Sequence, residues 1–135
     1  SADTVPTHKQ FIIDESYCLA MNVYHEARNQ PLAGQMAVIS VTVNRVNDKR
    51  FPNSICGVVY EGPHRPSWKD ETVMIPVRHR CQFSWYCDGK SDRVHDLTTL
   101  VLWMVVIPLQ ISPKVQRTIT QTMLNQHGQR LRPRR

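Results

Sequence analysis

The chain has no apolar run long enough to cross a lipid bilayer. Its longest apolar stretch, residues 97–109, is broken by threonines and a proline, and a transmembrane helix needs roughly 20 apolar residues. No signal peptide with basic, apolar and cleavage regions is visible at the N-terminus. We therefore expect no stable insertion into a membrane.

Cysteine is also scarce. The four cysteines are too few for a disulfide scaffold in a chain of 135 residues. Cys81 and Cys87 lie six positions apart, unlike the C-x-x-C pair of a zinc ribbon. Buried thiols are therefore the first expectation. One disulfide among Cys56, Cys81 and Cys87 is the alternative if the protein works outside the cytoplasm.

Positive charge is in excess, because 17 Lys and Arg residues face 11 Asp and Glu residues and give a net charge of +6. Such a charge favours anionic partners, which include nucleic acid, acidic lipid and anionic wall polymers. Much of the excess lies in the basic tail, residues 129–135, and terminal basic runs are commonly solvated. The charge alone therefore assigns no partner, while the length fits one compact domain.

A helix is predicted near the N-terminus. The polar residues 1–10 are expected to form a flexible arm. Asp14 is a suitable N-cap for a helix that runs to about Arg28. Its inward face is expected to hold Cys18, Met21 and either Tyr24 or His25.

A second helix is predicted from Leu32 to Val46, although its β-branched centre would also suit a strand. The apolar residues of one helical face decide for the helix; they are Met36, Ile39, Val43 and Val46. At its end, Asn44 and Arg45 are interpreted as a C-terminal cap with a favourable cation.

The middle of the chain is less regular. Residues 51–62 begin with a Pro-Asn-Ser turn and continue with an apolar run that fits either a helix or a strand. Residues 62–74 contain two prolines and many charges, which predicts a surface loop. Residues 81–92 alternate polar and aromatic side chains and contain an Asp-Gly turn signal, which predicts a short strand or hairpin edge.

The sequence lacks a complete metal or serine-nucleophile motif. His25 and Glu26 begin an H-E-x-x-H pattern, but Asn29 stands where the second histidine should be. The other histidines show no paired ligand spacing, and no G-x-S-x-G elbow supports a Ser-His-Asp triad. We therefore expect neither a metal nor a cofactor.

Glu26 is a candidate catalytic acid. A carboxyl group on a helix that faces a cleft loses solvation, and this loss raises its pKa. A glycosidase acid needs such a raised pKa in order to protonate a leaving oxygen. The plainer alternative is an ion pair of Glu26 with Arg28 or Arg45.

A second candidate segment is Gln82-Phe83-Ser84-Trp85. Its two polar residues alternate with two aromatic ones, and sugars need both hydrogen-bonding groups and aromatic faces. The alternative is an aromatic core segment whose polar side merely faces water.

Three blocks of the sequence together resemble the SleB-like cell wall hydrolases, which include spore-cortex lytic enzymes and related phage and bacterial lysins. The blocks are CLAMNVYHEARNQPLAGQMAVISVTVNRV, FPNSICGVVYE and CQFSWYCDGKSD, and they cover about residues 17–92. The resemblance implies an α+β, mainly α, lysozyme-like domain with two lobes, a small β element and a cleft between the lobes. It also implies cleavage between N-acetylmuramic acid and N-acetylglucosamine, by a muramidase or a lytic transglycosylase.

The resemblance also assigns residues. The family's catalytic glutamate, in its Tyr-x-Glu-Ala block, falls on Glu26, beside Tyr24. The Gln-Phe-Ser-Trp block falls on residues 82–85, which we expect along the cleft. In a lytic transglycosylase one glutamate suffices as acid and base, whereas hydrolysis calls for a second carboxylate, for which Asp88 and Asp92 are candidates. The expected substrate contacts are Tyr24, Gln82, Phe83, Ser84, Trp85 and Asp88.

These observations predict an N-terminal arm at residues 1–10, an incomplete SleB-like catalytic domain at 11–96 and a divergent segment at 97–135. We expect a monomer that acts on peptidoglycan at the bacterial wall, in the periplasm or outside the cell, or as a phage lysin. One alternative is an inactive relative that only binds glycan. Another is a basic nucleic-acid-binding protein, which the main interpretation excludes.

The resemblance disappears after about Asp96. The family continues with an alanine-rich helix and a block like GATHYHA, which this chain lacks. However, when each codon of residues 114–129 is read from its third base, the genetic code permits GATHYHADYVKPAWA. In the same frame Trp103-Met104-Val105 forces Asp-Gly.

We hypothesise a frameshift between about Val94 and Trp103. Residues 97–135 would then never have been selected as packing partners of the first two thirds of the chain. The nucleotide sequence of the gene tests the hypothesis: its shifted frame should encode Gly-Ala-Thr-His-Tyr-His, and any other reading would refute the idea.

Overall fold

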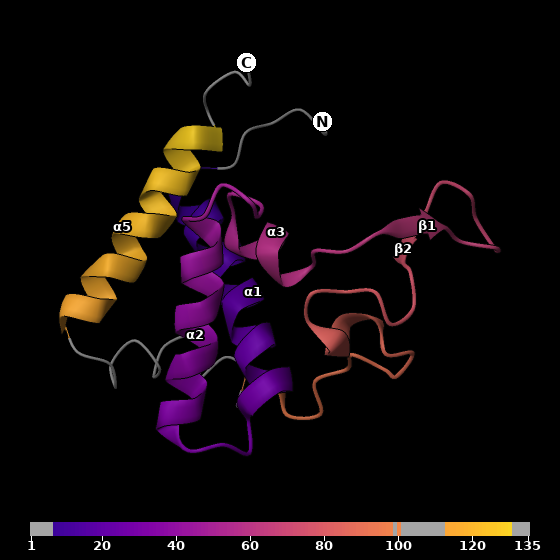
Figure 1. The fold of residues 1–135 in the computed structure, drawn as a ribbon, viewed down its shortest axis with the longest axis horizontal. Helices are drawn as coiled ribbons and strands as arrows, with labels where there is room; N and C mark the ends of the chain where they lie inside the picture. Colours follow the sequence, from indigo (N-terminus) through magenta and orange to yellow (C-terminus); the bar gives the residue numbers. More distant parts are fainter. Residues whose placement is uncertain (1–6, 99, 101–112, 131–135) are drawn as a thin grey trace.

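The computed structural model describes residues 7–98, 100 and 113–130. The described part is mainly helical and carries a small two-stranded antiparallel sheet (Figure 1), as the sequence predicts. Its elements are α1 (His8–Ala27), α2 (Leu32–Val46), α3 (Ile55–Val59), β1 (His64–Pro66), β2 (Met74–Pro76), the 3-10 helix η1 (Ser84–Cys87) and α5 (Pro113–Arg130). The predicted basic tail lies mostly outside the described residues.

Helix α1 ends at Ala27, as predicted, but it starts earlier than predicted. Its N-cap is Thr7, whose hydroxyl accepts a hydrogen bond from the Gln10 backbone N–H at 3.2 Å and so satisfies a free amide of the first turn. Asp14 lies within the helix and binds the Gln10 side chain instead. The predicted N-cap is therefore wrong, and residues 8–10 are helical and not part of an arm.

Helix α2 has the predicted bounds and lies beside α1 (Figure 1). Its buried face consists of Ile39, Thr42, Val43 and Val46. Three of these belong to the predicted apolar face, while Met36 is half-buried. Packing of this face has overridden the β propensity of the segment.

Helix α3 resolves the choice that the sequence left open for residues 51–62. The Ser54 hydroxyl accepts a hydrogen bond from the Gly57 N–H at 2.9 Å, so the Pro-Asn-Ser turn ends in a helix cap. Two links attach α3 to α1. The buried carboxylate of Glu15 accepts a hydrogen bond from the Ile55 N–H, and a disulfide joins Cys18 to Cys56.

The core lies where α1, α3 and η1 meet, with contributions from α2, α5 and Leu100. The sequence left open whether Tyr24 or His25 faces inward. Tyr24 does, because it is buried, whereas His25 is half-buried. The main cluster consists of Phe11, Cys18, Ala20, Met21, Tyr24, Val46, Ile55, Val58, Val59, Phe83, Trp85, Leu100 and Met123.

The loop predicted at residues 62–74 instead contains a strand and leads into another. Strands β1 and β2 pair antiparallel with Arg65 opposite Ile75. The prolines do not prevent this pairing, because Pro66 and Pro76 end the two short strands. The resulting hairpin projects from the helical body (Figure 1).

The strand predicted at residues 81–92 is wrong. Residues 84–87 form η1, and Cys81 is bonded to Cys87. An extended chain rises about 3.3 Å per residue and would separate these Cα atoms by about 20 Å, whereas they are 6.0 Å apart. The disulfide thus excludes a strand here. The predicted Asp-Gly turn is present, and Gly89 has a φ of 81°.

All four cysteines are paired, so the expectation of buried thiols is wrong. The alternative, one disulfide among Cys56, Cys81 and Cys87, includes the observed Cys81–Cys87 pair. It did not include Cys18, which is the partner of Cys56. Disulfides persist in oxidising compartments, and they restrain the unfolded chain more when they close a longer loop.

The two disulfides are expected to differ in their effect on stability. Their sequence separations are 38 for Cys18–Cys56 and 6 for Cys81–Cys87. Loop-closure entropy then predicts a loss of about 4 kcal/mol in the free energy of unfolding for Cys18→Ala/Cys56→Ala and about 2 kcal/mol for Cys81→Ala/Cys87→Ala. Urea denaturation of both double variants measures this, and equal losses or the reverse order would contradict the argument.

Candidate active site

Glu26 lies on the last turn of α1, and its side chain is exposed. Partial burial of the carboxyl raises the pKa of Glu26, and no neighbouring charge contributes to the shift. Among the described residues Glu26 forms no ion pair. The guanidinium of Arg28 instead lies over the Tyr24 ring at 5.0 Å, and that of Arg45 lies over Phe83 at 5.1 Å. The plainer ion-pair interpretation of Glu26 is therefore wrong.

The residue before Glu26 packs on η1. The His25 ring stacks on Trp85 with ring centroids 4.3 Å apart and an interplanar angle of 15°. Burial lowers the pKa of His25, although the negative charges of Asp92 and Asp88 act to raise it. His25 is therefore biased towards its neutral form and serves as an aromatic surface beside Glu26.

A chain of buried hydrogen bonds fixes Trp85. Its indole N–H donates to the Asn22 side-chain oxygen at 2.9 Å. The Asn22 amide N–H donates to the Thr42 hydroxyl at 3.1 Å, and that hydroxyl donates to the Val38 carbonyl at 2.8 Å. Asn22 lies one turn before Glu26 on the same side of α1. This relay joins η1, α1 and α2, one turn of α1 before the candidate acid.

Sequence reasoning missed Asn22 and Thr42. Both are polar residues inside helices whose neighbours in sequence are apolar, and both are fully buried. Because buried polar groups are nearly always hydrogen-bonded, an inward polar position of this kind is a signal for a structural network.

Aromatic rings continue from Trp85 towards the hairpin. Tyr60 lies edge-on to Trp85 at 6.1 Å and contacts Tyr86 at 4.8 Å, measured between ring centroids. The Tyr86 hydroxyl lies 3.1 Å from His64 Nε2, at the start of β1. We call His25, Trp85, Tyr60, Tyr86 and His64 the aromatic track. Burial raises the pKa of Tyr60 to about 12, so its hydroxyl stays protonated at neutral pH.

Two carboxylates lie on the loop that follows η1. Asp88 and Asp92 are half-buried. Burial raises the pKa of Asp92, while the nearby His25 lowers it and Asp88 raises it further. Neither carboxylate affects the pKa of Glu26. Both carboxylates thus influence the pKa of His25, which belongs to the aromatic track, and not the pKa of the candidate acid.

The structure separates the predicted substrate contacts into two groups. Gln82 and Ser84 are exposed, and Asp88 is half-buried. Tyr24, Phe83 and Trp85 are buried in the core cluster. The alternation of exposed polar and buried aromatic side chains was predicted, although a 3-10 helix and its flanks produce it instead of a strand.

The described residues contain no group of three or more histidine, cysteine, aspartate or glutamate side chains that could hold a metal ion. None of the described helices has the length and apolar character needed to traverse a membrane.

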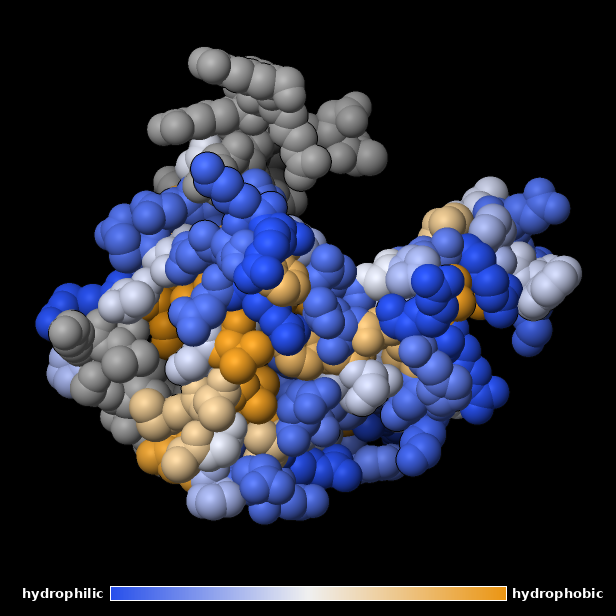
Figure 2. Space-filling model, in the orientation of Figure 1, coloured by the Kyte–Doolittle hydropathy of each residue, from blue (hydrophilic) through white to orange (hydrophobic). Residues whose placement is uncertain are grey.

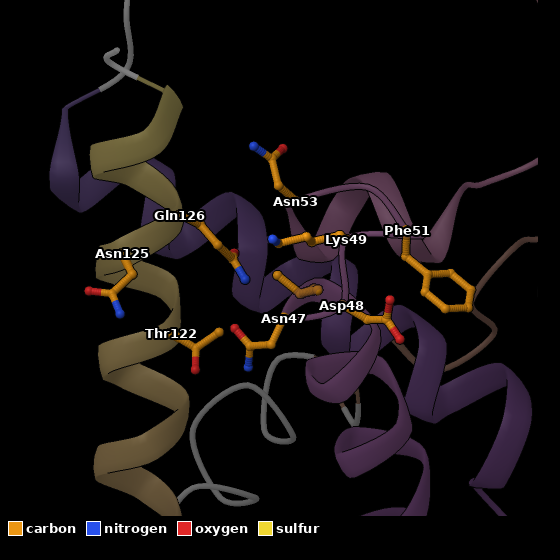
Figure 3. Close-up of a pocket in the computed structure, with 9 residues that line it drawn as sticks. Asn47, Asp48, Lys49, Phe51, Asn53, Thr122, Asn125 and Gln126 are labelled. Atoms are coloured by element: carbon orange, nitrogen blue, oxygen red, sulfur yellow. The ribbon is translucent and has the colours of Figure 1, made fainter. Parts of the chain in front are cut away.

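A cavity of about 380 Å³ lies away from this site, between α5 and the loop after α2 (Figure 3). Gln126 points into it, and both polar atoms of this buried amide lack a hydrogen-bond partner among the described residues. Helix α2 has 15 residues and is therefore about 22 Å long. Since the cavity lies at the end of α2 and Glu26 just before its start, the two are separate.

Residues 29–129 match the family described as Cell Wall Hydrolase. The match begins three positions after Glu26 and continues past Asp96, where the sequence blocks were expected to end. No solved structure matches.

Spore cortex-lytic enzymes are among the curated relatives. That of Bacillus subtilis (strain 168) is 51% identical over 43 residues, which are 32% of this chain and 14% of the relative. That of Halalkalibacterium halodurans is 46% identical over 43 residues, which are 32% of this chain and 13% of the relative. The aligned part thus spans about one seventh of these relatives. Because the family match covers about three quarters of the sequence, the chain belongs to the Cell Wall Hydrolase family and is SleB-like.

Proposed function

We propose that this chain cleaves the glycan strands of peptidoglycan between N-acetylmuramic acid and N-acetylglucosamine, with Glu26 as acid and base. The observation that carries the proposal is the state of Glu26: its pKa is raised by burial and it has no ion-pair partner among the described residues. A carboxyl group in this state can hold a proton and still reach a substrate from the surface. The family membership supports the choice of substrate.

The reaction would proceed as in a lytic transglycosylase. Glu26 donates its proton to the oxygen between the two sugars, and the bond from that oxygen to C1 of the muramic acid breaks. The resulting carboxylate then takes the proton of the C6 hydroxyl of the same sugar. The C6 oxygen bonds to C1, which gives a 1,6-anhydro product and returns Glu26 to its protonated form without consuming water.

Hydrolysis by a muramidase is the alternative within the same site. It requires a carboxylate that activates water or stabilises the positive charge at C1, and Asp88 and Asp92 are the candidates.

The substrate would lie between two lobes, as in lysozyme-like enzymes. One wall would be the end of α1 with η1, and the other would be the β1–β2 hairpin. Figure 2 shows that the hairpin stands apart from the helical body, with a notch that opens towards the top of the view. We infer that the exposed Gln82 and Ser84, together with Asp88, contact sugar hydroxyls. The buried Tyr24, Phe83 and Trp85 would shape the floor beneath them.

The two disulfides favour action outside the cytoplasm. We therefore propose that the chain works at the bacterial cell wall as a monomer.

A catalytically inactive glycan-binding relative is the second candidate. The observation that favours it is the buried Gln126 of α5, whose amide has no partner among the described residues. Selected interfaces seldom contain such groups. Binding of peptidoglycan without release of muropeptides would support this candidate.

Replacement of the proposed acid tests the function. Glu26→Gln is expected to lower muropeptide release from purified peptidoglycan by roughly 10²- to 10⁴-fold, because the amide cannot donate the proton. The thermal stability should stay unchanged, since the side chain is exposed and forms no ion pair with described residues. Asp14→Asn removes an exposed carboxylate from the same helix and should leave release unchanged.

The pH dependence gives a second readout. Because the first step needs protonated Glu26, release should fall as the pH rises through the raised pKa of Glu26. Mass spectrometry of the products distinguishes anhydro ends from reducing ends. Equal release by Glu26→Gln and the native chain would exclude Glu26 as the acid.

A further inference from the structure

The hairpin carries an unusual share of the exposed apolar surface. Trp68, at its tip, is 91% exposed, and Val73 and Met74 are also exposed. These are three of the eight large hydrophobic residues that the described part leaves exposed. A fully exposed tryptophan on a projecting element points to a contact with another molecule.

The tip that holds Trp68 is a hydrogen-bonded structure. The Ser67 N–H donates to the Val73 carbonyl at 2.8 Å, and the Lys69 N–H donates to the Ser67 hydroxyl at 3.2 Å. Asp70 accepts from both the N–H and the hydroxyl of Thr72, at 3.0 and 2.7 Å. Trp68 is thus presented on an ordered turn, so the backbone that carries it needs little further ordering in order to bind.

A cation accompanies the exposed ring. The guanidinium of Arg65 lies over Trp68 at 5.7 Å from the ring centroid. Over residues 63–80, four basic residues face two acidic ones; they are Arg65, Lys69, Arg78 and Arg80 against Asp70 and Glu71. The hairpin therefore offers an aromatic face together with positive charge.

The hairpin is continuous with the candidate active site. The aromatic track starts at His25, beside Glu26, and ends at His64, which is the first residue of β1. Arg65 and Trp68 follow His64 by one and four positions. The contacts of the track therefore link the neighbourhood of Glu26 to the hairpin.

We propose that the hairpin is a distal platform for the glycan strand, on which Trp68 stacks against a sugar ring several units away from the cleaved bond. Arg65 holds the indole and pairs with carboxylates of the peptide stems. Sugar C–H faces stack on aromatic rings and carboxylates pair with guanidinium groups, so this pairing of side chains fits peptidoglycan. The inference rests on the proposed function for the identity of the polymer.

The test compares long and short substrates. For Trp68→Ala, the ratio of turnover of long glycan strands to turnover of a soluble tetrasaccharide at low concentration should fall by about 2- to 12-fold, as expected for the loss of one aromatic stacking contact. Trp68→Phe should recover part of the ratio. Val41→Ala, which truncates an exposed apolar residue on α2, should keep the ratio of the native chain.

Binding to intact sacculi separates this inference from the proposed chemistry. In a pelleting assay with the Glu26→Gln chain, additional replacement of Trp68 by alanine should weaken binding by a similar factor, whether or not the chain cleaves glycan. An unchanged length ratio together with unchanged pelleting would overturn the platform. Trp68-dependent binding to anionic lipid vesicles, without binding to sacculi, would assign the hairpin to a membrane instead. Absence of muropeptide release from the native chain would refute the proposed function alone.

Discussion

The candidate site depends on one buried amide, the side chain of Asn22. It accepts a hydrogen bond from the indole N–H of Trp85 and donates one to the hydroxyl of Thr42, so it links η1, α1 and α2 at a single point. Each partner is buried, and a buried polar group that loses its partner costs about 1–3 kcal/mol. A rearrangement of η1 that breaks this bond therefore destabilises the packed region, unless another group replaces the lost partner. The stacking of Trp85 on His25, beside Glu26, follows from it.

Two covalent constraints act together with this relay. The Cys81–Cys87 disulfide closes the segment that contains Trp85, and the Cys18–Cys56 disulfide holds α3 on α1. Tyr60, which follows α3, then meets Trp85 and Tyr86. A continuous line of contacting rings thus connects the end of α1 to the hairpin. In contrast, α5 joins the body through Met123 but buries the amide of Gln126 without a hydrogen-bond partner among the described residues.

Local patterns in the sequence predicted the helices well, because apolar spacing and capping are properties of neighbouring residues. The bounds of α2 and the end of α1 are examples. The prediction failed where pairing or a covalent bond decides. The strand expected at residues 81–92 ignored the bond between Cys81 and Cys87. The loop expected at 62–74 ignored the pairing of residues 64–66 with residues 74–76. The start of α1 at Thr7 shows a choice between two suitable caps, Thr7 and Asp14. For the site, Glu26 and the residues of 82–85 were selected by resemblance, whereas Asn22 could be recognised only by its partners.

A double-mutant cycle between Asn22 and Trp85 tests the central claim most directly. Trp85→Phe removes the indole N–H while it keeps an aromatic ring, and Asn22→Ala removes the acceptor. The free energy of unfolding of both single variants and the double variant, measured in urea, gives the coupling between the two side chains. We expect a coupling of about 1 kcal/mol or more. A coupling near zero would show that this hydrogen bond does not hold Trp85 against His25.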